Sequence, residues 1–326
     1  MVHKLNKTKK ESATMYSNVK YLNPKADLTF KLVFGEHPDL VMSLLNALLP
    51  LADDEQITHV EYITPEMVPE NPAKKNSMVD VRCYDQMGRQ FIVEMQMEWN
   101  ESFKNRVVLN ASKAVVRQLK RNEDFKLVHP VYSLNLINDV GFDAGPDEFY
   151  HDYAIVNVEH TDRIIEGLRF VFIELPKFKP KTIVEKKMAV LWLRFLTEIN
   201  EQTKEAPAEL LENAEISKAL SIVEKSAFND AQLYAYEQFW DAVYVEKALI
   251  EGGYDKGRTE GIEEANRENA RKMKAKGYKA DDIAEITGLP ASEIDALWHH
   301  SSYIYLQKNY HRTSRQGDSN FNCLIY

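Results

Sequence analysis

The sequence lacks most features of secreted and membrane-bound proteins. Only Cys83 and Cys323 occur among 326 residues, so neither a disulfide framework nor a cysteine-based zinc site can form within one chain. No run approaches the roughly 18 apolar residues of a membrane span, and the lysine-rich N-terminus lacks the apolar segment of a secretory signal. We therefore expect a soluble, cytoplasmic protein without a membrane partner.

Acidic residues are absent from one stretch of an otherwise acidic chain. The formal net charge is −9, yet residues 1–135 hold 18 Lys and Arg against 17 Asp and Glu. Residues 102–121 hold six basic residues and no acid. A locally basic surface can exist on an acidic protein, and local charge is what a nucleic-acid phosphate senses within a Debye length.

The pattern of apolar residues changes along the chain. Strand patterns occur at 78–84, 90–98, 130–138, 151–159 and 168–175, with one helix pattern at 102–121 between the second and third. After Pro180 the patterns are helical, at 182–200, 207–226, 229–250 and 256–276. The expected parts are a flexible arm (1–20), an α/β domain (21–180), a helical region (181–276), a short helix-turn-helix-like segment (277–300) and a disordered tail (301–326).

Two short helices are expected near the C-terminus, at 281–287 and 291–298, joined at "GLP". The spacing fits a helix-turn-helix that contacts DNA. A short helical hairpin that binds nothing is the alternative.

A β-hairpin is predicted around "CYDQMGRQF", because Gly88 suits the left-handed position of a three-residue loop. Counting from this loop pairs Tyr84 with Gln90, Arg82 with Ile92, and Asp80 with Glu94. The opposite face then collects the apolar side chains Val79, Val81, Cys83, Phe91, Val93, Met95 and Met97.

Asp80 and Glu94 are therefore expected to face each other across the hairpin. Carboxylates with Cβ atoms roughly 4.5–5.5 Å apart repel unless a cation neutralises them. Mg²⁺ prefers carboxylate and carbonyl oxygens, and Gln96 on the same face adds an amide oxygen. Such a site suits phosphodiester hydrolysis. The alternative is the solvated face of an antiparallel sheet.

The basic helix that follows favours the metal site. Its polar residues Arg106, Asn110, Lys113, Arg117 and Lys120 recur every three or four positions, and its opposite stripe is Val108, Ala111, Val115 and Leu119. An ordinary surface helix is the alternative, although such helices mix charges of both signs. A metal-dependent nuclease needs both features, a basic ridge for phosphates and an acid pair for the ion.

Four segments carry a family resemblance: "ADLTFKLVFG" (26–35), "VDVRCYDQMGRQFIVEMQ" (79–96), "FKNR" (103–106) and "HPVYSLNLIN" (129–138). Together they resemble the PD-(D/E)XK nuclease family transposases, also called the recombination-promoting nuclease (Rpn) family. The resemblance runs over about residues 20–300, and "GYKADDIAEITGLPASEIDAL" is similar to the helical tail of many members.

The resemblance implies an α/β fold with a restriction-endonuclease-like mixed β-sheet core flanked by helices, followed by an all-helical C-terminal region. It implies cleavage of DNA with Mg²⁺, for which Mn²⁺ can substitute, and metal binding by Asp80 and Glu94. Gln96 stands where the wider superfamily usually has lysine. Because glutamine cannot act as a base, water activation would depend more heavily on the metal. An inactive DNA-binding or protein-interaction scaffold with this fold is the alternative.

Further candidates come partly from the resemblance and partly from the sequence patterns above. Asp27 matches a position where the superfamily often adds an acid to the catalytic site, although a helix N-cap or first-turn acid is an equal alternative. Arg106 would contact DNA or pair with Asp85 or Glu98. The candidate DNA-binding residues are Arg106, Lys113, Arg117, Lys120 and Lys31, and for Lys31 a solvated lysine on an amphipathic helix is the alternative. The C-terminal helices are a candidate homo-oligomer interface.

Overall fold

The computed structural model describes residues 19–64, 66–67, 77–120, 122–180 and 187–297. The predicted tail at 301–326 and most of the predicted N-terminal arm lie outside the described residues, as do Cys323 and Arg121. The chain forms two compact units, Met1–Glu246 and Lys247–Tyr326, which are described separately.

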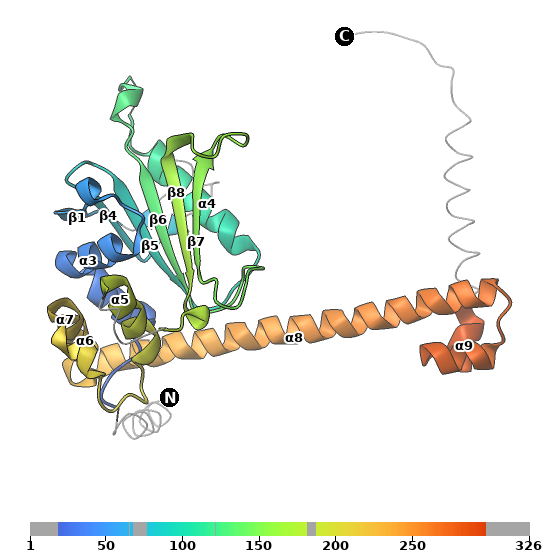
Figure 1. The fold of residues 1–326 in the computed structure, drawn as a ribbon. Coiled ribbons are helices and arrows are strands. Elements are labelled where there is room, and N and C mark those ends of the chain that lie inside the picture. Colours follow the sequence, from blue (N-terminus) through green and yellow to red (C-terminus); the bar gives the residue numbers. More distant parts are fainter. Residues whose placement is uncertain (1–18, 65, 68–76, 121, 181–186, 298–326) are drawn as a thin grey trace, which may run out of the picture. The chain divides into compact units, whose positions relative to one another are not determined.

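A six-stranded mixed sheet forms the centre of the first unit, in the order β1-β4-β5-β6-β8-β7 (Figure 1). β5, β6 and β8 run parallel, whereas the remaining pairs are antiparallel. The strands are β1 (Val60–Tyr62), β4 (Val81–Asp85), β5 (Gln90–Gln96), β6 (Val131–Ile137), β7 (Tyr150–Val156) and β8 (Ile164–Glu174). A separate short pair consists of β2 (Glu66–Met67) and β3 (Ser77–Met78).

Helices cover both faces of this sheet, which confirms the predicted fold class. The crossover helix between parallel β5 and β6 is α4 (Ser102–Val116), and it packs on one face. The opposite face packs against α2 (Asp27–Gly35), α3 (Pro38–Leu48), α5 (Met188–Glu198), α6 (Ala208–Glu212) and α7 (Ala214–Ile222). Short 3₁₀ turns are η1 (Asp53–Glu55), η2 (Phe125–Leu127), η3 (Leu175–Lys177) and η4 (Lys225–Ala227).

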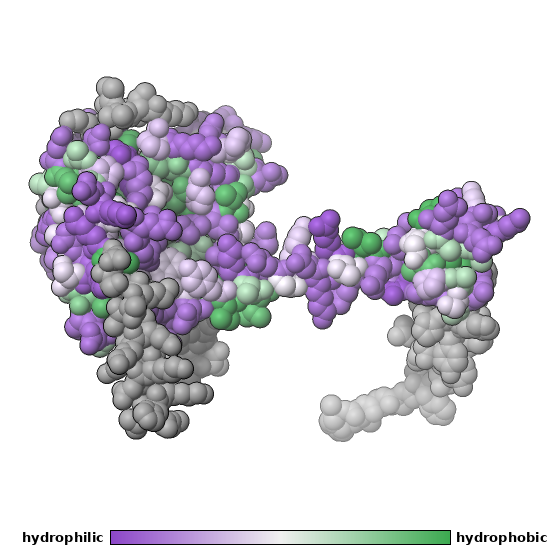
Figure 2. All heavy atoms as spheres, turned by 90° about the horizontal axis from the view of Figure 1, so that it is seen from below, coloured by the Kyte–Doolittle hydropathy of each residue, from purple (hydrophilic) through white to green (hydrophobic). Residues whose placement is uncertain are grey.

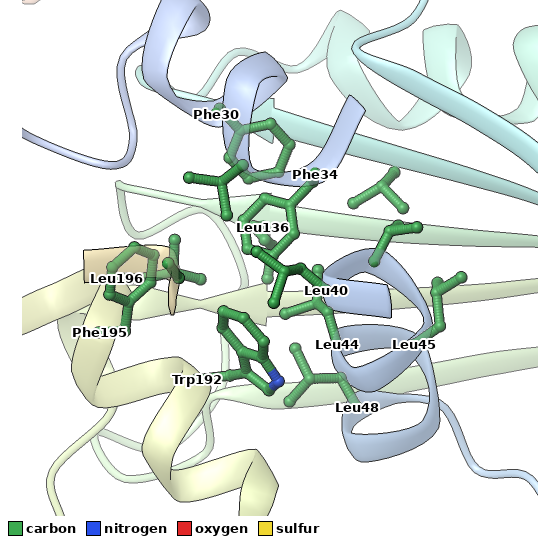
Figure 3. Close-up of a cluster of buried hydrophobic side chains, with 14 of the residues drawn as sticks. Phe30, Phe34, Leu40, Leu44, Leu45, Leu48, Leu136, Trp192, Phe195 and Leu196 are labelled. Atoms are coloured by element: carbon green, nitrogen blue, oxygen red, sulfur yellow. The ribbon is translucent and has the colours of Figure 1, made fainter. Parts of the chain in front are cut away.

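The main hydrophobic core contains residues from before and after Pro180, the point at which the sequence patterns become helical. Figure 3 shows Trp192 of α5 among the side chains of α2 and α3. Its ring lies 5.3 Å from that of Phe34, and its indole N–H donates to Ser43 Oγ at 3.1 Å. The helices after residue 180 therefore bury the same sheet face as the helices before it.

The C-terminal helices differ from the prediction in one respect. A single helix, α8 (Asp230–Ala275), replaces the two expected at 229–250 and 256–276. Gly252 and Gly253 lie between the two expected helices, but an interior glycine costs a helix only about 1 kcal/mol relative to alanine. The prediction of two short helices near the C-terminus is confirmed by α9 (Ala280–Thr287) and helical residues 291–297, which pack through Ile283 and Ile294.

Hydrophilic residues cover most of the visible surface in Figure 2. Within the described parts of the chain, no helix combines the length and the apolar character needed to cross a membrane.

Candidate active site on the β4–β5 hairpin

The β4–β5 hairpin has the predicted register. The ladder pairs Tyr84 with Gln90 and Arg82 with Ile92. Gly88 in the turn adopts φ 80°, the left-handed conformation that its position requires. The predicted hairpin is therefore confirmed.

The turn is stabilised by a buried ion pair. Arg89 Nε lies 2.7 Å from Asp85 Oδ2, and Asp85 Oδ1 also accepts the backbone N–H groups of Met87 and Arg89, each at 2.9 Å. These bonds close the loop locally, so the register of the two strands is set close to the turn.

Asp80 lies at the end of the hairpin away from the turn, directly before β4 begins at Val81. Its Oδ2 accepts the backbone N–H of Met95 at 2.7 Å, which places the carboxylate against β5 beside Glu94. Burial raises the pKa of Asp80 to about 6. The Met95 hydrogen bond opposes that rise, whereas the charge of Glu94 adds to it.

Val79 departs from the predicted pattern. We expected its side chain on the same face as Val81, but it packs against Ile92 and Ala111 on the α4 side of the sheet. The regular ladder stops at Val81, so the alternation of faces does not extend beyond it. Val81, Cys83, Phe91 and Val93 lie in the main core as expected. Met95 packs against that core while partly exposed, and Met97 is buried outside it.

Glu94 is buried on β5, with 6% of its surface exposed. Its Oε1 accepts a hydrogen bond of 2.9 Å from Asn110 Nδ2, and its Oε2 lies 4.0 Å from Arg106 Nη2. Burial raises the pKa of Glu94, while the Asn110 hydrogen bond and the Arg106 charge work in the opposite direction. Two helical side chains thus hold this carboxylate.

Gln96 uses both ends of its amide. Its Oε1 accepts a hydrogen bond from Arg106 Nη2, and its Nε2 donates to the backbone oxygen of Glu98 at 2.7 Å. The guanidinium of Arg106 is about half exposed. Gln96 therefore holds Arg106 next to Glu94.

The buried face of α4 is rotated relative to the prediction. We expected Val108 in the apolar stripe, but 46% of it is exposed, and Leu119 lies beyond the end of the helix at Val116. The buried residues are Phe103, Val107, Asn110, Ala111 and Ala114. Phe103 and Val107 are large, lie one turn apart and fill the space against β6 and β8, so they set the rotation of the helix.

That rotation turns Asn110 toward Glu94. The sequence placed Asn110 on the polar side of the helix without a role in the site. Its position one turn after Arg106 was the available signal, because residues four apart share a helix face.

Asp27 and Lys31 lie on α2 and form an ion pair at 2.5 Å. Asp27 is a first-turn acid, since the N-cap is Ala26. Both charges reach Asp80: Lys31 lowers its pKa and Asp27 raises it. The structure therefore brings these two candidates into the electrostatic environment of Asp80.

The remaining candidate DNA-binding residues follow the direction of α4. Lys113 is in the last turn and is half-buried, Arg117 is the exposed C-cap, and Lys120 is exposed beyond the helix. They lie progressively further along the chain from Arg106 and stay candidates for contact with phosphates.

The donor set fits a hard divalent cation. Asp80 and Glu94 supply carboxylate oxygens whose raised pKa values reflect burial that nearby positive charges do not fully offset. Within the described part of the chain, no three His, Cys, Asp or Glu side chains cluster closely enough to hold a metal alone. Mg²⁺ commonly takes only one or two carboxylates and completes its shell with water and substrate phosphate.

Comparison with known proteins identifies the family. A family model described as PD-(D/E)XK nuclease family transposase matches residues 24–253. No curated protein and no solved structure matches the chain. The match covers more than half of the sequence, and the chain belongs to the PD-(D/E)XK nuclease family transposases.

Proposed function

We propose that the protein is a Mg²⁺-dependent DNA endonuclease, related to recombination-promoting nucleases, that hydrolyses phosphodiester bonds at Asp80 and Glu94. The observation that carries this proposal is the pair of buried carboxylates, one held by the Met95 N–H and the other by Asn110. Membership in a nuclease family gives the pair its expected chemistry.

Each residue of the site has a distinct role in this proposal. Asp80 and Glu94 would hold the metal, which when bound supplies a polarised phosphoryl oxygen and an activated water. Arg106, oriented by Gln96, would contact the phosphate and stabilise its developing negative charge. Lys31 adds positive charge from α2, and Asp27 holds it there through their ion pair.

One observation favours a second function. Gln96 occupies the position where the wider superfamily usually has lysine, and both ends of its amide are engaged. An amide has no pKa that would let it serve as a general base. An inactive protein that binds DNA or acts as a scaffold is therefore the competing candidate.

The two functions are separated by incubating supercoiled plasmid DNA with the protein and Mg²⁺, or Mn²⁺ as a substitute. The endonuclease predicts nicked or linear products with wild type, none with EDTA, and a large loss with Asp80→Asn. Asp53→Asn, an exposed acid in η1, is the matched control. Binding without cleavage under either ion would support the inactive protein, and equal cleavage by Asp80→Asn would reject the assigned site.

Two further predictions concern the association of copies of the protein and its location in the cell. Association of copies through the C-terminal helices is tested by light scattering across a concentration series, with and without residues 247–326. Location in the cytoplasm is tested by cell fractionation.

A further inference from the structure

A second site lies further along the hairpin. An open hollow of about 480 Å³ is lined by side chains that include Arg82, Tyr84 and Gln90 of the hairpin, and Arg117 and Gln118 after α4. Ile63 and Thr64 complete the lining, so two of its seven residues are arginines. Of the residues that line it, only Arg117 is also one of the candidate DNA-binding residues described above.

Arg82 is a buried cation that has no acidic partner in the described part of the chain. Only 8% of the residue is exposed, and its Nη2 donates to the neutral Gln90 Oε1 at 2.9 Å. Its Nε is buried and has no hydrogen-bond partner. Among the described residues, no carboxylate lies within ion-pair distance of Arg82. A buried charge without a counterion is costly, so this arrangement favours an anion in the hollow.

Arg117 brings a second positive charge to the same hollow. Burial lowers the pKa of Arg82, and the charge of Arg117 lowers it further, which indicates that the two guanidinium groups repel each other. The adjacent Gln118 fixes the end of α4, because its side chain donates to the His129 oxygen at 2.9 Å and accepts the His129 N–H at 2.7 Å. The hydrogen bonds of Gln118 therefore hold the neighbouring Arg117 close to Arg82.

The hollow lies on the same side of the sheet as the acid pair. Arg82 pairs with Ile92, and Glu94 is two residues further along β5, on the face that α4 covers. Two strand residues span about 7 Å. A nucleic-acid strand advances about 3.4 Å per nucleotide along a duplex, so one to two nucleotides separate the two places.

We propose that Arg82 and Arg117 together bind one internal phosphate of the nucleic-acid strand, one or two nucleotides from the phosphate at Asp80 and Glu94. The inference rests on the proposed function for the identity of the ligand. Guanidinium groups suit it because their planar N–H donors match phosphate oxygens. The hollow thereby sets the path of the strand across the hairpin.

The test measures binding alone, without cleavage. A fluorescent DNA duplex with unphosphorylated ends is titrated with protein in EDTA over a series of KCl concentrations. The compared proteins are wild type, Arg117→Gln, Arg82→Gln and the double variant. Arg163→Gln, an exposed arginine outside the hollow, is the control.

Losing one phosphate contact should reduce the slope of log K against log[salt] by about 0.9 in Arg117→Gln. The double variant should lose no more than about 0.9, because both arginines hold one phosphate. Arg163→Gln should match wild type. Arg117 is exposed, so its variant stays informative even if Arg82→Gln does not fold.

A wild-type slope in Arg117→Gln would overturn the proposal, as would a loss of about 1.8 in the double variant, which indicates two separate phosphates. The same titration with a 5′-phosphorylated duplex is run in parallel, and an effect seen only with that duplex would overturn the assignment to an internal phosphate. Because EDTA removes cleavage from the measurement, failure here leaves the nuclease proposal standing. A protein that never cuts DNA can still pass this test.

Discussion

Asn110 donates a hydrogen bond of 2.9 Å to Glu94, and both side chains are buried between α4 and β5. The bond favours the charged form of Glu94, because it lowers the pKa that burial raises. In Asn110→Ala we expect DNA cleavage to fall by about 10- to 100-fold, the usual effect of removing a residue that orients a metal ligand.

The pH dependence of the cleavage rate shows whether Asn110 orients Glu94 or only supports the fold. Without the Asn110 donor the pKa of Glu94 rises, so the acid limb of the rate profile should move to higher pH. Asn105→Ala, exposed on the same helix, should leave rate and profile unchanged. An Asn110→Ala enzyme with a lower rate but an unshifted acid limb would contradict the orienting role.

Gln96 and Arg106 should act as one unit. If Gln96 serves to hold Arg106, Gln96→Ala should lower the cleavage rate, and the double variant with Arg106→Ala should be no slower than Arg106→Ala alone. A double-mutant cycle on single-turnover rates measures this coupling. Additive losses would show that Gln96 acts independently of Arg106.

The free energy of unfolding should depend on pH through the carboxyl group of Glu174. Burial raises the pKa of its carboxyl, but hydrogen bonds from Lys177, His151 and two backbone N–H groups outweigh that effect and hold the pKa below its usual value. The lowered pKa means that the folded state binds fewer protons than the unfolded state. This contribution to stability is present above the unfolded pKa and is lost as pH falls through the folded pKa.

We therefore expect Glu174→Gln to lower the free energy of unfolding by about 3 kcal/mol at pH 7, since it leaves Lys177 buried without its partner. The difference from wild type should shrink as pH falls below about 4. Urea denaturation at several pH values measures it. Glu166→Gln, exposed on the same strand, is the control, and an equal loss at every pH would contradict the account.

Substitution of Trp192 tests whether the helices after residue 180 share a hydrophobic core with the sheet. Trp192→Ala removes a fully buried ring that packs on Phe34 and Phe195, so we expect a loss of about 3–5 kcal/mol. Leu211→Ala, half exposed on α6, should cost less than about 1 kcal/mol. In thermal unfolding followed by circular dichroism, the sheet and the helices that pack on it should unfold in one transition. Two transitions, of which Trp192→Ala shifts only one, would contradict a shared core.

The parts of the fold that local sequence determines were predictable. Gly88 and the alternation around it specify the β4–β5 register, because a one-residue shift would bury the polar face. The mixed sheet and its crossover helix follow from the order of strand and helix patterns. The three-residue β1 was missed, since so short a strand shows no recognisable period.

The rotation of α4 could not be read from its own sequence. Its apolar residues permit several buried faces, and the choice depends on the space that β6 and β8 leave for Phe103 and Val107. Asn110 was therefore not recognised as a partner of Glu94. The buried Arg82 was missed for a similar reason, because its hollow needs Arg117 from a distant part of the chain.

The position of a divalent cation tests most directly whether Asp80 and Glu94 hold the catalytic metal. Crystals of the protein soaked in Mn²⁺ would be measured at a wavelength where manganese scatters anomalously. We expect an anomalous peak bound by carboxylate oxygens of both residues, and we expect it to disappear in Asp80→Asn crystals. Well-ordered carboxylates without a peak between them, or a peak elsewhere in the protein, would contradict it.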